Sequence, residues 1–154
     1  MNEGIALSKY LARESIPTTV MTDASLFSNI SNVDMVIVGS DAISKNGIIN
    51  KIGTKVITQL ASDYDIPVYV LSLIEKILPF PYDVKINQNK NPDEITNSTN
   101  SRLHISNYYF DTSPLNLISA IITQEGMFSS TELISYMKSL HLHPEMEQFL
   151  IRDK

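Results

Sequence analysis

The sequence contains no cysteine, no long apolar run and no block of like charge. Without cysteine, the chain itself offers no disulfide, no thiolate metal ligand and no cysteine nucleophile. Its apolar stretches are far shorter than the roughly 20 residues that span a bilayer, and its first residues lack the basic start and apolar run of a signal peptide. We therefore predict a cytoplasmic protein without membrane contact. The net charge of −5 argues against direct binding to nucleic acid, since both partners would be negative.

The composition is that of one globular domain, predicted to span residues 1–154. Hydrophobic residues make up 43% of the chain, which is enough for a sizeable core. Residues 33–40 form a continuous apolar run, typical of a strand covered on both faces. Further strands are predicted at residues 16–22, 68–73, 105–110 and 120–123.

Apolar residues recur at helical spacing between these strands. The spacing predicts helices over residues 3–15, from Asn50 onward and from Thr131 onward, and Asp23 is the predicted N-cap of a shorter helix. Strand and helix therefore alternate, which predicts an α/β fold with a Rossmann-like parallel sheet flanked by helices. Residues 79–101 contain three prolines and many Asn, Ser and Asp residues, so we predict a surface excursion there.

A turn of small residues, Gly39, Ser40 and Asp41, follows the apolar run. Open α/β sheets bind ligands beyond the carboxyl ends of their strands, so this turn is a candidate site. Gly39 would let the backbone turn closely, and Asp41 would act as a general acid or base.

The residues after this turn suggest an anion site. Gly47, the Asn50 side chain and the free N–H groups of the next helix could hold an anion, with Lys51 adding a cation. The alternative is that Asp41 only caps a turn and Lys51 is a solvated helix residue, and residue chemistry alone favours neither. The sequence has neither a G-x-G-x-x-G nor a Walker pattern.

Three separated segments resemble a known family. They are VDMVIVGSDAISKNGIINKIGT, IPVYVLS and FDTSPLNLISAIITQEG. In this order they look like the carboxyl-terminal domain of the family that unites translation initiation factor 2B alpha, beta and delta subunits with methylthioribose-1-phosphate isomerase and ribose-1,5-bisphosphate isomerase. The resemblance covers about residues 3–126. It implies a Rossmann-like sheet whose first strand, in the family, would precede Met1.

The resemblance also implies roles for individual residues. The isomerase members bind a sugar phosphate and move a proton between two carbons, and Asp41 stands at the place of their catalytic aspartate. Asn50 and Lys51 match the pair that lines the substrate. Lys76 approximates a lysine of the site, although Ile77 follows it where the family has phenylalanine.

Asp111 is the last member of the predicted site. It is either the N-cap ahead of a helix at Pro114 or, as in the family, an acid near the sugar. The predicted substrate-binding residues are therefore Gly39, Ser40, Asn50, Lys51, Lys76 and Asp111, and the predicted catalytic residue is Asp41.

The missing cysteine decides between two functions. The isomerases pair their aspartate with a cysteine, and proton shuttling needs two groups on either side of the substrate. We therefore expect a noncatalytic subunit-like protein or fragment, without a cofactor, that keeps a vestigial pocket for a phosphorylated sugar or a nucleoside monophosphate. We expect it to form a homo-oligomer, a dimer, or to join related subunits. The alternative is an aldose–ketose isomerase completed by a missing amino-terminal half.

Two weaker patterns have simpler explanations. His141 and His143 lie beside Glu145, but helical metal pairs are usually three or four residues apart, so no metal site is predicted. The aromatic residues 108–110 resemble an RNA-stacking cluster. In an acidic chain with strand periodicity they are better explained as packing residues.

Overall fold

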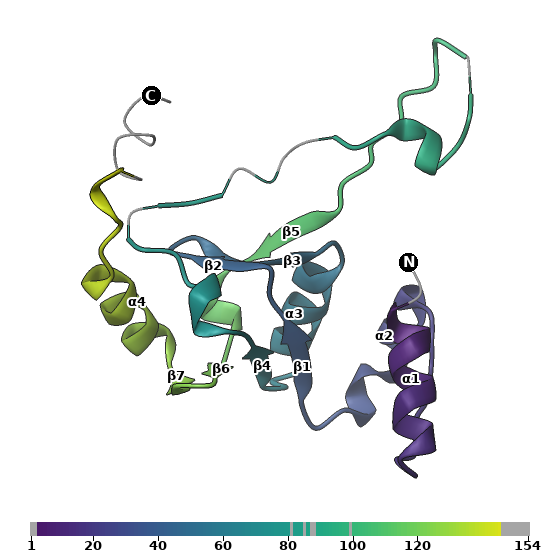
Figure 1. The fold of residues 1–154 in the computed structure, drawn as a ribbon. Helices are drawn as coiled ribbons and strands as arrows, with labels where there is room; N and C mark the ends of the chain where they lie inside the picture. Colours follow the sequence, from purple (N-terminus) through teal and green to yellow (C-terminus); the bar gives the residue numbers. More distant parts are fainter. Residues whose placement is uncertain (1–2, 81, 85, 87–88, 99, 146–154) are drawn as a thin grey trace. The chain divides into compact units, whose positions relative to one another are not determined.

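The computed structural model describes residues 3–80, 82–84, 86, 89–98 and 100–145 (Figure 1). The chain divides into two compact units, Met1–Asn32 and Val33–Lys154. Over the described ranges, none of the helices combines the length and the apolar character needed to cross a membrane.

The first unit begins with the predicted helix. Helix α1 (Glu3–Arg13) lies within the predicted residues 3–15, and the chain reverses after it, with Ser15 at a φ of 61°. Residues 16–22 form no strand, so that prediction is wrong. Their β-branched composition gives only a weak preference, which produces a strand when a neighbouring strand pairs with it.

Short helical segments complete the first unit. They are η1 (Asp23–Ser25), α2 (Leu26–Asn29) and η2 (Ile30–Asn32). Thr22, and not Asp23, occupies the N-cap position of η1, and its side chain makes no capping hydrogen bond. The short helix is therefore present where it was predicted, but the predicted cap is wrong by one residue.

The larger sheet of the second unit has the strand order β1, β4, β6, β7 (Figure 1). Strands β1 (Val36–Gly39), β4 (Val68–Leu71) and β6 (Ala120–Thr123) are parallel. Strand β7 (Gly126–Phe128) pairs with β6 in the antiparallel direction. The predicted α/β fold with parallel strands and flanking helices is confirmed, and an antiparallel edge strand is added to it.

Register explains how this sheet contributes to the core. Val36 pairs with Val68, and Val70 pairs with Ile121, and all four side chains are buried. Apolar burial of this kind supplies most of the driving force for folding. Ile37, the next residue of β1, is 56% exposed.

A second sheet, with the order β2, β3, β5, was not predicted. Strands β2 (Ala42–Ser44) and β3 (Gly47–Lys51) form a hairpin, and β5 (Phe110–Ser113) pairs antiparallel with β3. The helix predicted from Asn50 starts instead at Thr54, in α3 (Thr54–Asp63). Asn50 and Lys51 are therefore strand residues and not residues of a helix start.

Gly47 also differs from its predicted role beside an anion. It is buried, pairs with Ser44 at the start of β3 and has a φ of 146°. A Cβ added to it would lie 2.2 Å from the Ser113 carbonyl oxygen. Only glycine suits both the backbone angle and this close approach of β3 to β5.

The segment between β4 and β5 contains the predicted surface excursion, and its described residues are mostly exposed. Asn107 closes this loop, because its N–H donates to Asn89 Oδ1 at 2.7 Å and its side-chain amide donates to the Asn91 carbonyl at 2.9 Å. The Tyr109 hydroxyl donates to Glu94 Oε2 at 2.6 Å. This hydrogen bond lowers the pKa of Glu94 and raises the pKa of Tyr109.

Helix α4 (Ser130–Ser139) follows β7 and begins with a capping box. The Glu132 N–H donates to Ser129 Oγ, and Glu132 Oε2 accepts from the Ser129 N–H at 2.8 Å and from its hydroxyl at 2.7 Å. The helix predicted from Thr131 onward therefore begins one residue earlier, at Ser130. Leu133 and Met137 face inward from this helix and are fully buried.

Ser129→Ala is expected to lower the free energy of unfolding by about 1 kcal/mol at neutral pH, because the first turn of α4 loses its cap. The Ser129 hydroxyl, followed by its N–H, holds the pKa of Glu132 below its ordinary value. Such a carboxylate stabilises the fold above its unfolded pKa and loses this effect as the pH falls through the folded pKa. The cost of Ser129→Ala should therefore be smaller at pH 3 than at pH 7 in equilibrium urea unfolding.

Ser135→Ala is the matched control for this experiment. Ser135 lies inside the same helix and its hydroxyl donates to the Thr131 carbonyl, so no cap is lost. The free energy of unfolding of this variant should stay within about 0.5 kcal/mol of the wild-type value at both pH values. An equal cost of Ser129→Ala at pH 3 and pH 7 would contradict the part assigned to the Glu132 carboxylate.

Candidate ligand site at the carboxyl ends of the parallel strands

Two serines meet where β1 and β4 end. Ser40 directly follows β1, and it is only 4% exposed. Its hydroxyl donates to Ser72 Oγ at 2.7 Å, and the Ser72 hydroxyl donates to the Leu73 carbonyl at 3.1 Å. The parallel pairing of β1 with β4 brings these two strand ends together, which is the place where open α/β sheets bind ligands.

Lys76 reaches the same place from the chain after β4. It ends a single 3-10 turn, η3 (Ile74–Lys76), and its Nζ donates to the Ser40 carbonyl at 2.5 Å. An ammonium group has three N–H donors, so two remain beyond the Ser40 bond. The structure thus brings the predicted residues Ser40 and Lys76 into contact, although Ile77 replaces the phenylalanine of the family pattern.

Asp41 lies next to these groups in the chain and is exposed. Its N–H donates to the Ile49 carbonyl at 2.8 Å, which brings its backbone close to Asn50 on β3. We refer to Ser40, Asp41, Ser72 and Lys76 as the strand-end cluster. It combines a carboxylate, two hydroxyls and one cation, the groups that can bind the hydroxyls and the phosphate of a small polar ligand.

Asn50 and Lys51 point in different directions, because adjacent residues of a strand face opposite sides of the sheet. The Asn50 side-chain amide donates to Thr54 Oγ1 at 3.1 Å, toward the start of α3. Lys51 Nζ lies 5.4 Å from the centre of the Tyr109 ring, and Lys90 Nζ lies at the same distance from that ring. The structure therefore separates the two side chains that the sequence analysis treated as a pair.

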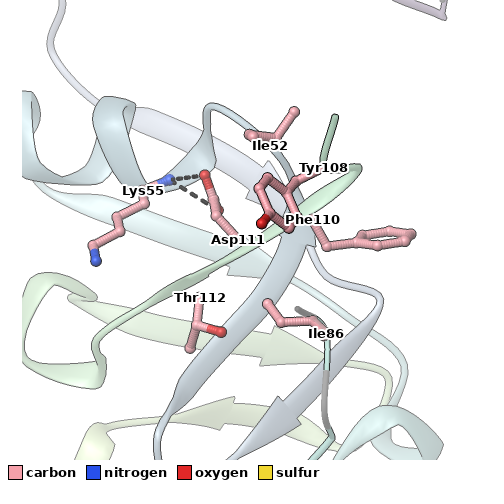
Figure 2. A pocket seen from close by; sticks show the side chains of 7 residues that line it. All are labelled: Ile52, Lys55, Ile86, Tyr108, Phe110, Asp111 and Thr112. Carbon is pink, nitrogen blue, oxygen red and sulfur yellow. Dashed lines mark hydrogen bonds between the residues drawn. The ribbon is translucent and has the colours of Figure 1, made fainter. Parts of the chain in front are cut away.

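Asp111 caps a helix, but not the one predicted. Its carboxylate accepts from the Gly53 N–H at 2.8 Å. It also accepts from the Lys55 N–H at 3.1 Å, in the first turn of α3 (Figure 2). The anion expected at this helix start is thus supplied by the chain itself, from β5. Pro114 precedes only the 3-10 turn η5 (Leu115–Leu117), without a side-chain cap.

Gly39 is not required by close packing. A Cβ built at this position would have no atom within 4 Å, whereas the sequence analysis expected a close backbone turn. A side chain could therefore be accommodated at the last residue of β1.

An open hollow lies beside Asp111, along β5 (Figure 2). Its lining is mostly apolar and aromatic, with Asp111 and Lys55 near the start of α3. The lining residues are Ile52, Lys55, Ile86, Tyr108, Phe110, Asp111 and Thr112. Tyr109 and Phe110 contact each other edge to face, with ring centres 6.4 Å apart, so packing accounts for this part of the aromatic cluster.

Within the described residues, the histidine pair suggested by the sequence, His141 and His143, is not joined by further side chains that could bind a metal. His143 Nδ1 lies 4.0 Å from Glu145 Oε2, and both side chains are exposed. Among the residues that the structure describes, no three His, Asp or Glu side chains come together as a metal site would require.

Sequence analysis missed two polar residues at this end of the sheet. Ser72 follows β4 directly, so the rule that polar groups at strand ends form sites would have found it. Gln124 follows β6, and its side chain contacts Ile74 and Glu75 in the turn that carries Lys76. Nothing in the local sequence indicates that contact, because the two segments are 50 residues apart.

Comparison with known proteins gives a family. Residues 1–130 match the model of the Initiation factor 2 subunit family. The chain is 36% identical over 143 residues to translation initiation factor eIF2B subunit beta of Schizosaccharomyces pombe. It is 37% identical over 139 residues to methylthioribose-1-phosphate isomerase of Parabacteroides distasonis.

The chain spans well under half the length of these relatives. The two matches cover 88% and 82% of this chain but only 36% and 41% of the respective relatives. Activities of the whole relatives therefore do not transfer to these 154 residues by similarity alone.

Solved structures show the same fold. The crystal structure of eIF-2B subunit delta from A. fulgidus matches 84% of this chain and 41% of its own, with a TM-score of 0.72 and 26% identity. The crystal structure of 5-methylthioribose 1-phosphate isomerase from Pyrococcus horikoshii matches 82% of this chain and 39% of its own, with a TM-score of 0.70. Its sequence identity is 24%, so this match supports the fold alone. The family predicted from the three sequence segments is confirmed: this chain belongs to the initiation factor 2 subunit family.

Proposed function

We propose that the chain is a noncatalytic, subunit-like member of its family that binds a phosphorylated sugar or a nucleoside monophosphate at the strand-end cluster. The observation that carries this proposal is the contact of Lys76 Nζ with the Ser40 carbonyl, beside the hydrogen-bonded pair of Ser40 and Ser72. A cation held next to hydroxyls offers charge-assisted hydrogen bonds to phosphate oxygens. Asp41, at the same strand end, would accept hydrogen bonds from sugar hydroxyls.

Turnover by this chain alone lacks a second proton-transfer group. Moving a proton between two carbons needs a group that removes it and a group that returns it. Asp41 could take one role, and the resemblance assigns the other to a cysteine, a residue type that these 154 residues do not contain. The alternative function is an aldose–ketose isomerase whose second group comes from another polypeptide segment.

We further propose that the chain works by association with copies of itself or with related subunits, in the cytoplasm. Several of its relatives are subunits of translation initiation factor eIF2B, which supports this proposal. Association would give the chain a function that does not depend on catalysis.

Isothermal titration calorimetry with ribose 1,5-bisphosphate tests the proposed binding site. We expect weak binding, with a Kd of about 1 mM, which corresponds to about −4 kcal/mol. Lys76→Ala should weaken it about tenfold, because a charge-assisted hydrogen bond to phosphate is lost. Asp41→Asn should also weaken it, through the sugar hydroxyls.

Lys138→Ala is the matched control, because Lys138 is an exposed lysine on α4 that lies over the Phe80 ring. This variant should bind like the wild type. Binding that is tighter than about 1 μM and survives both Asp41→Asn and Lys76→Ala would place the ligand elsewhere. Conversion of the sugar phosphate by the wild-type chain alone, followed by NMR, would favour the isomerase alternative.

A further inference from the structure

Gln124 makes an unusual set of contacts for an exposed side chain. It follows β6, and its Oε1 accepts from the Ile74 N–H at 3.1 Å. Its Nε2 donates to Glu75 Oε2 at 3.2 Å and to Glu75 Oε1 at 3.3 Å. The amide orientation is fixed by chemistry, since the reverse orientation would put NH₂ against an N–H and oxygen against a carboxylate.

We infer that Gln124 is a positioning residue that holds Lys76 in the strand-end cluster, an inference that rests on the proposed role of Lys76 in ligand binding. Gln124 forms hydrogen bonds with the first two residues of η3, Ile74 and Glu75, and Lys76 is the third residue. The parallel pairing of β4 with β6 brings Gln124 next to this turn. The Ser72 N–H extends the pairing beyond β4 by donating to the Ile122 carbonyl at 3.0 Å.

The turn itself has little rigidity of its own. Two backbone hydrogen bonds close it, from the Lys76 N–H to the Leu73 carbonyl at 3.1 Å and from the Ile77 N–H to the Ile74 carbonyl at 3.0 Å. Isolated 3-10 turns have poor hydrogen-bond geometry and are weak. The side-chain clamp from Gln124 therefore contributes directly to where Lys76 lies.

Gln124 also controls the carboxylate next to Lys76. Glu75 precedes Lys76 in the chain, and both of its oxygens accept from Gln124. Without this amide, Glu75 would be free to compete with the Ser40 carbonyl, and with an anionic ligand, for the Lys76 ammonium group. Loss of Gln124 should therefore loosen the turn and give Lys76 a competing partner.

Quantitative acetylation of lysines, measured by mass spectrometry on the full 154-residue chain, tests this inference without any ligand. Gln124→Ala should raise the acetylation rate of Lys76 about three- to tenfold, because its hydrogen bond to Ser40 is lost or intermittent. The rates of Lys55 and Lys138 should stay unchanged. Gln59→Ala is the matched control, since Gln59 also donates to a carboxylate, that of Asp63, but on α3.

A second variant separates positioning from general destabilisation. If Glu75 competes for Lys76, the double variant Gln124→Ala with Glu75→Gln should bind ribose 1,5-bisphosphate more tightly than Gln124→Ala alone. An unchanged acetylation rate of Lys76 in Gln124→Ala would overturn the inference. So would an equal rise in the acetylation rate of every lysine together with a lower Tm. Because the acetylation needs no ligand, a failure of the proposed binding function would leave this result interpretable by itself.

Discussion

Gly47→Ala is expected to lower the free energy of unfolding by at least about 2 kcal/mol, or to prevent folding. The added Cβ would lie 2.2 Å from the Ser113 carbonyl oxygen and 2.9 Å from its carbon, so β3 and β5 would have to separate. Both contacts are with backbone, which cannot move aside as a flexible side chain can. Urea unfolding followed by circular dichroism measures the effect.

Gly126→Ala is the matched control for the steric part of this prediction. Gly126 has a φ of 135°, similar to that of Gly47, but an added Cβ there would have no atom within 4 Å. Both variants therefore share the backbone strain, and only Gly47→Ala adds the clash. Gly126→Ala should lower the free energy of unfolding by at least about 1 kcal/mol less than Gly47→Ala does. Equal losses of unfolding free energy in the two variants would contradict the close approach of β3 to β5.

Asp111→Ala is expected to lower the free energy of unfolding by about 1–3 kcal/mol. The carboxylate ties β5 to the start of α3 through the Gly53 and Lys55 N–H groups, which would lose their acceptor. A negative charge at a helix start also interacts favourably with the helix dipole. Asp111→Asn should have an intermediate cost, because its amide oxygen accepts but carries no charge.

Hydrogen exchange locates the effect of Asp111→Ala. The amides in the first turn of α3 should exchange faster in this variant, whereas those of α4 should not. Asp93→Ala is the control, since Asp93 is exposed in the 3-10 turn η4 (Pro92–Glu94), and it should cost less than about 0.5 kcal/mol. A stability of Asp111→Ala equal to that of the wild type would show that Asp111 is not the cap of α3.

The parallel sheet was predictable because its strands have strong local patterns. Residues 33–40, 68–73 and 120–123 are dense in β-branched and aliphatic residues, and each contains a strand of the sheet. Residues 16–22 have a similar pattern but form no strand. Local composition therefore indicates where a strand can form, and pairing with a neighbour decides whether it does.

The hairpin of β2 and β3 was missed although the sequence contains a signal for it. Ser44 pairs with Gly47, so the loop has two residues, Lys45 and Asn46. Asn46 and Gly47 form an Asn-Gly pair, which marks a turn, and Gly47 begins β3 directly after the loop. The apolar spacing that predicts a helix from Asn50 begins inside β3, four residues before the observed start of α3 at Thr54.

The candidate site was predictable only in part, because its contacts join distant segments. The rule for strand ends pointed to Ser40 and Asp41, and the resemblance pointed to Lys76. The contact of Lys76 with Ser40 joins residues 36 positions apart, and the contact of Asp111 with Gly53 joins residues 58 positions apart. Such distances follow from strand order and register, which periodicity does not determine.

The most direct test of the proposed function is a ¹H–¹⁵N NMR titration of the 154-residue chain with ribose 1,5-bisphosphate. We predict that the largest chemical-shift changes occur at the amides of Ser40, Asp41, Ser72 and Lys76, and that Lys76→Ala moves the titration to about tenfold higher ligand concentration. Changes concentrated in the hollow along β5, or at the opposite end of the parallel strands, would contradict a ligand site at the strand-end cluster.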